Sequence, residues 1–294
     1  MFESIDIGIV TYNRKNVLEE TLSKILNGDI SSINKIHIID NNSTDSTGSS
    51  PILNHSKINY VKLKENIGSA GGFARCMKEL LKTKADWIWL FNDDSYPMFG
   101  AVESLNLARE KLKNKKVGMV KVSREVEGKA EILFWNGVRK TKFIPISNKI
   151  LESDLVTFDG SLISKKMIKD MGTCNPDYFM GTYEFDFCLR AKDKNYKIYT
   201  LPNGTIFDLK LGSAGGSPPW RTYYNTRNHL NLVLKRKSLK GVFQWIIRES
   251  KYTYGIIFFK DKKIKRLSLK FLASYHGAFG LLGKTISPTD SRWI

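Results

Sequence analysis

The amino-acid sequence predicts an α/β protein with a doubly wound, mostly parallel sheet. Short apolar, β-branched stretches alternate along the chain with stretches whose apolar residues recur at helical spacing. The expected strands cover residues 5–10, 36–40, 58–62, 87–91 and 117–122, and the expected helices cover residues 17–26, 70–82 and 101–112. This alternation is typical of βαβ units, whose ligands bind at the carboxyl ends of the strands.

The pattern changes near residues 212–219, where glycine, serine and proline predict a boundary or a mobile loop. Beyond this point the sequence predicts three basic, aromatic-rich helices at residues 223–235, 242–260 and 267–282. We therefore expect two regions, an α/β domain over residues 1–208 and a basic helical region over residues 209–294.

Positive charge is concentrated in the second region. Residues 209–294 contain 17 Lys and Arg and 3 acids, so they carry +14 of the net charge of +18. Such a surface attracts nucleic acid, anionic lipid head groups or pyrophosphate-bearing substrates. The basic residues alternate with aromatic and aliphatic ones between 245 and 272, which favours docking on an anionic membrane. Packing against the α/β domain or a partner subunit, as in a homo-oligomer, is the alternative.

The cysteines and the N-terminus indicate the cellular setting. Cys76, Cys174 and Cys188 have neither metal-ligand spacing nor an even number, so we expect reduced thiols. The N-terminus lacks the basic and apolar regions of a signal peptide, and no run of about 18 apolar residues occurs. We expect a cytoplasmic protein that can also attach peripherally to the inner face of the cell membrane.

Polar loops follow the first four expected strands, at residues 11–14, 40–45, 66–72 and 92–95. Because the carboxyl ends of parallel strands meet at one edge of a sheet, we expect these loops to form one shared cleft. The loop at 92–95 follows an apolar strand directly with two acids, Asp93 and Asp94. Carboxylates at a strand tip can hold Mg²⁺ or Mn²⁺ together with a substrate's pyrophosphate. An ordinary acidic turn is the alternative.

Two further loops have both a ligand-binding and a structural interpretation. The carboxylate of Asp40 can accept the imide N–H of uracil or thymine, or it can cap the polar turn that follows. Glycines in residues 68–72 allow close approach of a ligand to a helix N-terminus, which favours anions. Helix starts also use glycine for purely steric reasons.

A second acidic cluster, Glu184 and Asp186, lies at the start of a predicted helix among Phe and Tyr residues. Apolar surroundings raise the pKa of a carboxylate towards the range of a general base. The alternative is a favourable charge at the helix N-terminus that pairs with Arg190.

Together, these segments resemble the family 2 glycosyltransferases over roughly residues 5–235. The matching segments are IVTYNRKNVLEETL, IIDNNSTDST, NIGSAGGFARCM, WIWLFNDDSYP, YEFDFCLRAKDKNYKI and YYNTRNHLNL. The segment NIGSAGGFARCM followed by W-x-W-L-x-N-D-D-S is most similar to bacterial galactofuranosyltransferases and rhamnosyltransferases. The resemblance implies a GT-A fold, a Rossmann-like sheet that binds nucleoside-diphospho-sugars, here followed by the basic helical region.

The activity implied by the resemblance is inverting transfer of a hexose in surface-polysaccharide synthesis. The donor would be a UDP- or dTDP-sugar, with UDP-galactofuranose as the first expectation and dTDP-rhamnose as the alternative. The cofactor would be Mn²⁺ or Mg²⁺, and the acceptor a glycan or a polyprenyl-pyrophosphate-linked glycan. One in-line displacement would invert the anomeric carbon, with no covalent sugar intermediate.

The resemblance also implies roles for individual residues. Those expected to bind the donor's base and ribose are Thr11, Tyr12, Arg14, Asp40 and Asn42. Those expected along the donor's phosphates and sugar are Asn66, Gly68, Gly72 and Arg75, and Asp93 belongs to the donor site as well. Asn92 and Asp94 match the outer positions of the family's D-x-D element, and Asn92 would be a weaker, neutral metal ligand. Asp208 falls where the family often has a metal-binding histidine. Glu184 matches the general base, with Asp186 as a residue that positions the acceptor or orients the base.

Two other classes of protein fit the sequence less well. A nucleotidyltransferase would usually carry a glycine-rich loop directly after the first strand, whereas residues 11–14 contain no glycine. A non-enzymatic nucleic-acid binder would explain the basic tail but not the carboxylate clusters before it. We therefore expect no nucleic-acid partner.

Overall fold

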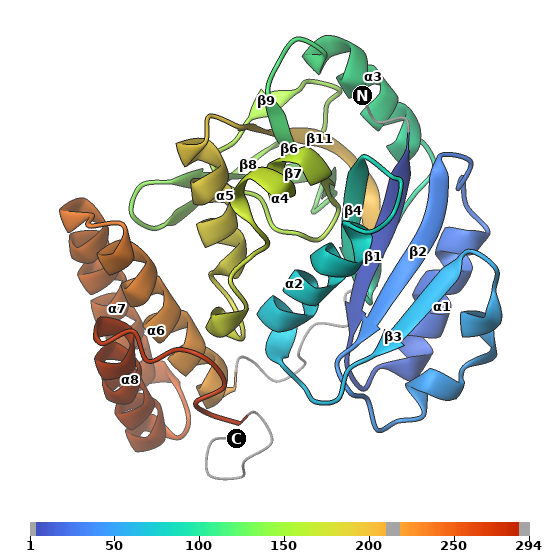
Figure 1. Ribbon diagram of the computed structural model, residues 1–294. Coiled ribbons are helices and arrows are strands. Elements are labelled where there is room, and N and C mark those ends of the chain that lie inside the picture. Colours follow the sequence, from blue (N-terminus) through green and yellow to red (C-terminus); the bar gives the residue numbers. More distant parts are fainter. Residues whose placement is uncertain (1–3, 210–217, 288–294) are drawn as a thin grey trace.

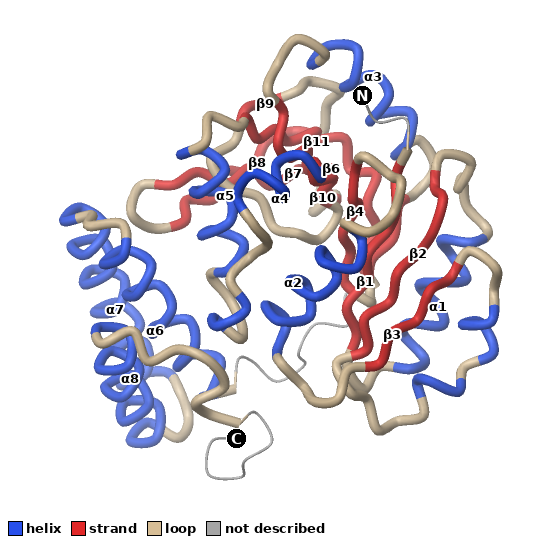
Figure 2. Tube along the Cα trace, in the orientation of Figure 1, coloured by secondary structure: helices blue, strands red, loops and turns tan. Residues whose placement is uncertain are grey.

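The computed structural model describes residues 4–209 and 218–287. Its main sheet has nine strands, eight of them in the order β3-β2-β1-β4-β10-β6-β11-β5, with β9 paired to β11 (Figures 1 and 2). The strands are β1 (Ile5–Thr11), β2 (Ile33–Asp40), β3 (Ile58–Lys62), β4 (Trp87–Asn92), β5 (Ser95–Pro97), β6 (Val117–Arg124), β9 (Leu151–Glu152), β10 (Ser161–Ser164) and β11 (Lys197–Asp208).

The sheet is mixed, so the prediction of a mostly parallel sheet holds only for its first half. Strands β1 to β4 are parallel neighbours, as are β6 and β11. In contrast, β10 runs antiparallel to both β4 and β6. The reason is the connection from β6 to β10, which passes through a hairpin, β7 (Lys129–Trp135) and β8 (Arg139–Pro145), and not through the crossover helix that a parallel strand would need.

Helices cover both faces of the sheet, and the alternation along β4 shows why. Trp89 and Phe91 point into the core shared with α1 (Lys15–Leu26) and α3 (Ala101–Leu112). Ile88 and Leu90 point into the core on the opposite face. The helices packed there are α2 (Gly68–Leu80), α4 (Lys165–Met171) and α5 (Tyr183–Asp193). The predicted helices at 17–26, 70–82 and 101–112 are confirmed. Three short 3₁₀ helices, η1 (Thr47–Ser49), η2 (Pro51–Asn54) and η3 (Pro176–Tyr178), complete this part.

The basic region forms three helices beside the sheet, α6 (Pro219–Lys235), α7 (Leu239–Phe259) and α8 (Lys263–Ala278) (Figure 1, orange to red). All three predicted helices are confirmed, although α8 ends four residues earlier than expected. Most of the predicted boundary at 212–219 lies outside the described residues. The division into regions 1–208 and 209–294 stays a prediction.

Buried polar contacts attach α6 to the α/β part. Asn228 Nδ2 donates to the carbonyl oxygens of Tyr178 and Met180, at 2.9 and 2.7 Å. Arg227 is fully buried and donates to the Tyr178 and Gly283 carbonyls. Because a buried donor or acceptor without a partner costs about 1–3 kcal/mol, this network fixes α6 against residues 178–180, directly before α5.

Candidate active site

The strand pairing places three of the four predicted loops at one edge of the sheet. Thr11, the last residue of β1, is paired with Asp40 at the end of β2. On the other side of β1, Val10 is paired with Asn92 at the end of β4. A side chain that sequence reasoning missed, Asn41, attaches the fourth loop: its Oδ1 accepts the Ile67 N–H and its Nδ2 donates to the Gly68 carbonyl. The four loops therefore meet at this edge, and the shared cleft that they were expected to form stays a prediction.

Asp93 is a structural residue of this edge. Its buried carboxylate accepts the Thr11 hydroxyl at 2.8 Å and Arg14 Nη1 at 2.7 Å, while its carbonyl accepts the Thr21 hydroxyl. Burial raises the pKa of Asp93 to about 6, against the lowering effect of Arg14 and Thr11. Since the side chains of Thr11 and Asp93 bind each other, neither is freely available to a donor sugar.

The Asp94 side chain is more exposed than that of Asp93, at 17% against 6%. Arg14 forms an ion pair with both carboxylates. Arg14 Nη1 also lies 2.9 Å from Asp94 Oδ2, so one guanidinium nitrogen bridges both carboxylates. Asp93 and Asp94 form the turn between β4 and β5, so the acidic-turn alternative describes the backbone here, while a cation from another loop pairs with the Asp94 carboxylate.

Asp40 is completely buried, and the structure shows its turn-capping role directly. Its Oδ1 accepts the Ser43 N–H at 2.8 Å, and its Oδ2 accepts a short hydrogen bond from the Tyr60 hydroxyl. A base could reach Asp40 only through the remaining lone pairs of these oxygens. Asn42 follows it with a φ of 69° and, like Tyr12, is partly exposed at the same edge.

Packing accounts for both predicted glycines. A Cβ on Gly68, whose φ is 75°, would lie 2.2 Å from the Phe179 carbonyl oxygen, and that oxygen also accepts the Ala70 N–H. A Cβ on Gly72 would lie 2.5 Å from Val10 Cγ1. The steric alternative is therefore the one that the structure supports, and Gly72 is not at the loop edge but between α2 and β1.

Asn66 and Arg75 differ in their surroundings. Asn66 is partly exposed and its Oδ1 accepts the Gly68 N–H at 2.9 Å, which shapes the start of α2. Arg75 lies two turns into α2, is exposed, and pairs with Glu79 at 2.8 Å. The structure thus brings Asn66 to the edge, whereas the Arg75 guanidinium is engaged on the surface of α2.

The predicted metal ligands lie near one another but do not form a complete site. Asp208 is paired with Ser95 across β5 and β11, and the Leu209 N–H donates to the Asp94 carbonyl at 2.9 Å. The Asp208 carboxylate, however, forms an ion pair with Arg124. Within residues 4–209 and 218–287, no group of three or more His, Cys, Asp and Glu could hold a metal ion. Asn92 and Asp94 fit a divalent cation only as two oxygen ligands that a substrate would complete.

The second acidic cluster divides into two different environments. Asp186 is buried and pairs with Arg190 Nε at 2.8 Å, so the helix-pairing alternative describes this residue. Glu184 Oε1 accepts the Phe158 N–H at 2.6 Å. Burial raises the pKa of Glu184 to about 7, although this hydrogen bond and the charge of Lys121 oppose the rise. A carboxyl with that pKa can accept a proton near neutral pH.

Sequence reasoning missed Asp159, which lies between the two acidic clusters. Its Oδ1 accepts the Asn92 N–H at 3.1 Å and a short hydrogen bond from the Ser95 hydroxyl. No strand was expected at residues 161–164, so nothing in the sequence placed Asp159 at the edge of the sheet. The only signal was a polar Asp-Gly pair directly before a short apolar run.

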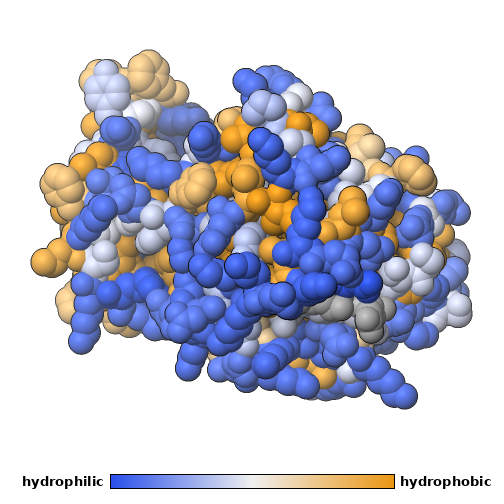
Figure 3. Space-filling model, turned by 90° about the horizontal axis from the view of Figure 1, so that it is seen from above, coloured by the Kyte–Doolittle hydropathy of each residue, from blue (hydrophilic) through white to orange (hydrophobic). Residues whose placement is uncertain are grey.

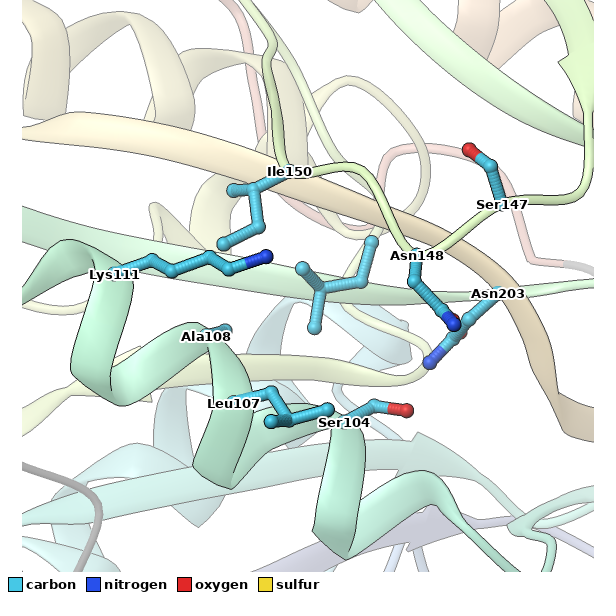
Figure 4. Close-up of a pocket in the computed structure, with 9 residues that line it drawn as sticks. Ser104, Leu107, Ala108, Lys111, Ser147, Asn148, Ile150 and Asn203 are labelled. Atoms are coloured by element: carbon cyan, nitrogen blue, oxygen red, sulfur yellow. The ribbon is translucent and has the colours of Figure 1, made fainter.

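A separate cavity of about 50 Å³ lies between α3 and the segments around residues 147–150 and 201–203 (Figure 4). In Figure 4, Lys111 and Leu107 reach into it from α3, and Asn148 and Asn203 approach from the other side. None of the predicted site residues lines this cavity. Figure 3 shows that hydrophilic residues cover much of the face seen from above, with smaller hydrophobic patches between them.

The curled mixed sheet, with acidic residues at the end of β4 and at the start of α5, is the GT-A fold of glycosyltransferases. Residues 6–172, more than half of the chain, match the family described as glycosyl transferase family 2, and the chain belongs to that family. The predicted family and fold are therefore confirmed.

Two curated relatives are similar to this chain. The dTDP-rhamnosyl transferase RfbF of Shigella flexneri is 22% identical over 298 residues, which cover 94% of this chain and 95% of that protein. The galactofuranosyltransferase GlfT1 of Mycobacterium tuberculosis is 31% identical over 113 residues, which are 37% of this chain and 36% of that protein.

Solved structures share the fold at low sequence identity. S. aureus TarS 1-349 in complex with UDP-GlcNAc has a TM-score of 0.56 at 15% identity, covering 92% of this chain and 79% of that chain. The mannosyltransferase PcManGT from Pyrobaculum calidifontis, in complex with GDP-Man and Mn²⁺, has a TM-score of 0.55 at 14% identity, covering 93% and 75%.

Proposed function

We propose that this protein is an inverting glycosyltransferase that moves a sugar from a UDP- or dTDP-sugar to a glycan or lipid-linked glycan acceptor in cell-surface polysaccharide synthesis. The observation that carries the proposal is the position of Glu184, a carboxyl with a pKa of about 7 that is tied through residues 158 and 159 to the turn bearing Asn92 and Asp94. UDP-galactofuranose is the first candidate donor. Full-length similarity to a dTDP-rhamnosyl transferase supports dTDP-rhamnose as the second.

The reaction needs a base, and Glu184 is the residue we assign to it. Its carboxylate would take the proton of the acceptor hydroxyl while that oxygen bonds to the anomeric carbon and the bond to the nucleoside diphosphate breaks. A positioned general base contributes about 10²–10⁴-fold to the rate. Asp186 would orient the start of α5 through its pair with Arg190, and not act on the substrate.

Asn92 and Asp94 would hold Mn²⁺ or Mg²⁺, which would neutralise negative charge on the departing diphosphate. Asp208 is a further candidate ligand, provided that its ion pair with Arg124 opens. Arg14 would offset part of the negative charge of Asp93 and Asp94 at the same corner, because its guanidinium pairs with both. We place the donor's base and ribose near Tyr12, Asp40 and Asn42, and its phosphates near Asn66.

We also propose that α7 and α8 dock on an anionic membrane, where a polyprenyl-pyrophosphate-linked acceptor would be found. Their exposed apolar residues include Phe243, Ile246, Tyr254, Ile257, Phe258, Phe259, Ile264, Phe271 and Phe279. Packing within the chain accounts for Ile256 and Leu269, which are buried, but not for those, and packing against a partner subunit stays the alternative. Each Lys or Arg near an acidic leaflet contributes about 1 kcal/mol, and the same helices carry Lys251, Lys260, Lys262 and Lys263 on or between them.

The proposed docking on a membrane does not require a helix that crosses it. Among the described helices, none has the length and apolar character required to cross a bilayer. Peripheral attachment at the inner face of the cell membrane, from the cytoplasm, is the arrangement we propose.

A donor screen tests the proposed activity. The full-length protein is incubated with Mn²⁺ or Mg²⁺, lipid-linked acceptors and a panel of UDP- and dTDP-sugars that includes UDP-galactofuranose and dTDP-rhamnose. We expect acceptor-dependent release of UDP or dTDP with one donor. Release of inorganic pyrophosphate would instead indicate a nucleotidyltransferase, and steeply salt-dependent retention of nucleic acid on a filter would indicate a nucleic-acid binder.

A further inference from the structure

We infer that Asp159 and Lys121 are positioning residues, which together couple the turn bearing Asn92 and Asp94 to the base Glu184. The inference rests on the proposed function, because it concerns the two halves of that active site. Neither residue lies in a segment that resembles the family's motifs. The juxtaposition of their charges is visible only in the folded chain.

Asp159 fixes the first half of the site. One oxygen of its carboxylate accepts two hydrogen bonds, from the backbone N–H of Asn92 and from the Ser95 hydroxyl. These two donors lie on either side of Asp93 and Asp94 in the chain, so a single carboxylate holds both ends of the acidic turn. Hydrogen bonds to an ionised acceptor are roughly twice as strong as bonds between neutral groups.

The preceding residue fixes the second half. The Phe158 N–H donates to Glu184 Oε1, and the fully buried Phe158 ring packs edge-on against Tyr183 and Phe187, which flank Glu184 in α5. The ring also meets Phe73 of α2. Residues 158 and 159 thus connect the base and the acidic turn through adjacent peptide units that the core holds in place.

Lys121 lies in β6, where it is paired with Ser161, two residues after Asp159. In β6, Met119 belongs to the core on the α5 face of the sheet, and Lys121, two residues on, points to the same side. Its ammonium group lies beside Gly160, the residue after Asp159, since a Cβ on that glycine would be in ordinary contact with Lys121 Nζ, at 3.4 Å. The neighbouring carboxylates of Asp159 and Glu184 favour the charged lysine, whereas burial lowers the pKa of Lys121.

The charges that face Glu184 come from three elements. Lys121 on β6 and Arg139 on β8 favour its ionised form, and Asp159 before β10 opposes it. The other titratable neighbours are the Tyr183 hydroxyl and the Cys174 and Cys188 thiols, and burial raises the pKa of each, so they stay neutral near pH 7. Removing the Lys121 charge should therefore raise the pKa of Glu184, and removing the Asp159 charge should lower it.

The test follows the titration of Glu184 directly, in the protein without substrate. The Glu184 carboxyl is observed by ¹³C NMR in ¹³C-glutamate-labelled protein, assigned with Glu184→Gln, in the wild type and in Lys121→Met, Lys121→Arg and Asp159→Asn. A charge within about 4–6 Å shifts a carboxyl pKa by one unit or more. We expect the pKa to rise by about one unit in Lys121→Met, to return in Lys121→Arg, and to fall in Asp159→Asn.

Lys115→Met, an exposed lysine just before β6, is the matched control and should leave the titration unchanged. A Glu184 pKa that is the same in wild type and Lys121→Met would overturn the inference. If Lys121→Met does not fold, Lys121→Gln replaces it in the same comparison. The fall of the Glu184 pKa expected in Asp159→Asn then tests the inference independently, and its absence would contradict it. This titration needs no turnover, so a protein that transfers no sugar in the donor screen can still show these pKa shifts. Failure of the inference can therefore be distinguished from failure of the proposed function.

In an active preparation, the acid limb of the pH profile of kcat should move with the NMR value. A merely structural role for Lys121 would lower kcat equally at all pH values and leave the limb in place. For Asp159→Asn, we also expect Mn²⁺ binding, measured by electron paramagnetic resonance in the presence of UDP, to weaken several-fold, because the turn that carries Asp94 loses its anchor. Unchanged Mn²⁺ binding would remove Asp159 from the coupling.

Discussion

Arg14 and Asp94 form an ion pair in which Nη1 of the arginine lies 2.9 Å from Oδ2 of the aspartate. The same nitrogen binds Asp93, so the tip of β4 carries a fixed cation from the loop after β1. One guanidinium between two carboxylates leaves excess negative charge at this corner, which favours the binding of a divalent cation. Among the residues that the structure describes, only Arg14 binds the Asp94 carboxylate, and it engages one oxygen, so the other would be available to a metal ion that arrives with the donor.

Asp94→Ala should abolish transfer without unfolding the protein, because it removes the candidate metal ligand from a partly exposed side chain. The measurement is nucleoside diphosphate release as a function of Mn²⁺ concentration, with the melting temperature as a check on folding. Asp29→Ala, which changes an exposed aspartate in the loop that precedes β2, at the opposite end of that strand from Asp40, is the control. Full activity of the wild type in excess EDTA would contradict the metal-dependent account.

Restoring the family's acid in Asn92→Asp should lower the Mn²⁺ concentration needed for half-maximal activity. A carboxylate is a better ligand for a hard cation than an amide oxygen. Asn92 is exposed and its backbone, not its side chain, makes the bond to Asp159, so the substitution should fold normally. If the Mn²⁺ dependence is the same in both proteins, Asn92 is not a metal ligand.

Much of the fold could be predicted from sequence because β1, β2 and β4 are largely buried strands with an unambiguous apolar pattern. The second half could not, since β8 is largely exposed and has no apolar alternation to indicate a strand. Strand β10 was missed for a different reason, since it is buried but has only four residues. Boundaries such as the start of β2 at Ile33 also depend on neighbours that only the fold supplies.

The site was predictable where a motif marks it and not where packing decides. Asp94, Glu184 and Asn66 lie at positions consistent with the roles that the resemblance implies. Gly72 is explained by contact with Val10, and no single-chain pattern distinguishes a packing glycine from a ligand-binding one. Asn41 and Asp159 act by holding backbone groups of distant loops, a relationship that sequence spacing does not encode.

Glu249→Gln should destabilise the helical region. Glu249 is buried and its carboxylate lies 2.5 Å from both Arg248 and Lys270, so the neutral variant leaves buried Lys270 without its counter-ion. Breaking a buried pair in this way costs about 3–5 kcal/mol. Chemical denaturation measures the loss, with exposed Glu103→Gln as the control. A free energy of unfolding within about 0.5 kcal/mol of wild type, the usual range for surface changes, would contradict this role.

The same group predicts how stability depends on pH. Burial opposes ionisation of Glu249, but Arg248 and Lys270 outweigh it and hold its pKa below the usual value. A carboxyl with a lowered folded-state pKa contributes stability above its unfolded-state pKa of about 4.3, and that contribution is lost as the pH falls further. Denaturation of the wild type between pH 3 and 6 should show a loss that Glu249→Gln lacks.

The double variant Phe258→Ser/Phe259→Ser should bind anionic vesicles at least tenfold more weakly than wild type. These rings are exposed at the end of α7, and full burial of one such side chain is worth about 1.5–3 kcal/mol. Co-sedimentation at low and high salt measures the binding. Phe143→Ser, an exposed ring on β8, should have no effect. If the wild type binds neither neutral nor anionic vesicles at low salt, membrane docking is contradicted, and α7 and α8 are packing or oligomerisation elements.

In the wild type, kcat should rise with pH and level off above about pH 7. The base must be ionised to accept the acceptor's proton, and burial raises the pKa of Glu184 to about 7, so activity is lost as the pH falls through that value. Rates measured from pH 5 to 9 with saturating donor and acceptor check this. A kcat that stays constant down to pH 5, as expected for a base with the pKa of an exposed carboxyl near 4, would indicate a different base.

The central claim, that Glu184 is the base and Asp186 is structural, is tested most directly by comparing kcat for Glu184→Gln and Asp186→Asn at saturating substrate. We predict that Glu184→Gln keeps donor affinity and lowers kcat by about 10²–10⁴-fold. Asp186→Asn should lower the melting temperature, since it breaks the buried pair with Arg190, while its folded fraction keeps most of its activity. An inactive, folded Asp186→Asn beside a nearly wild-type Glu184→Gln would contradict the account.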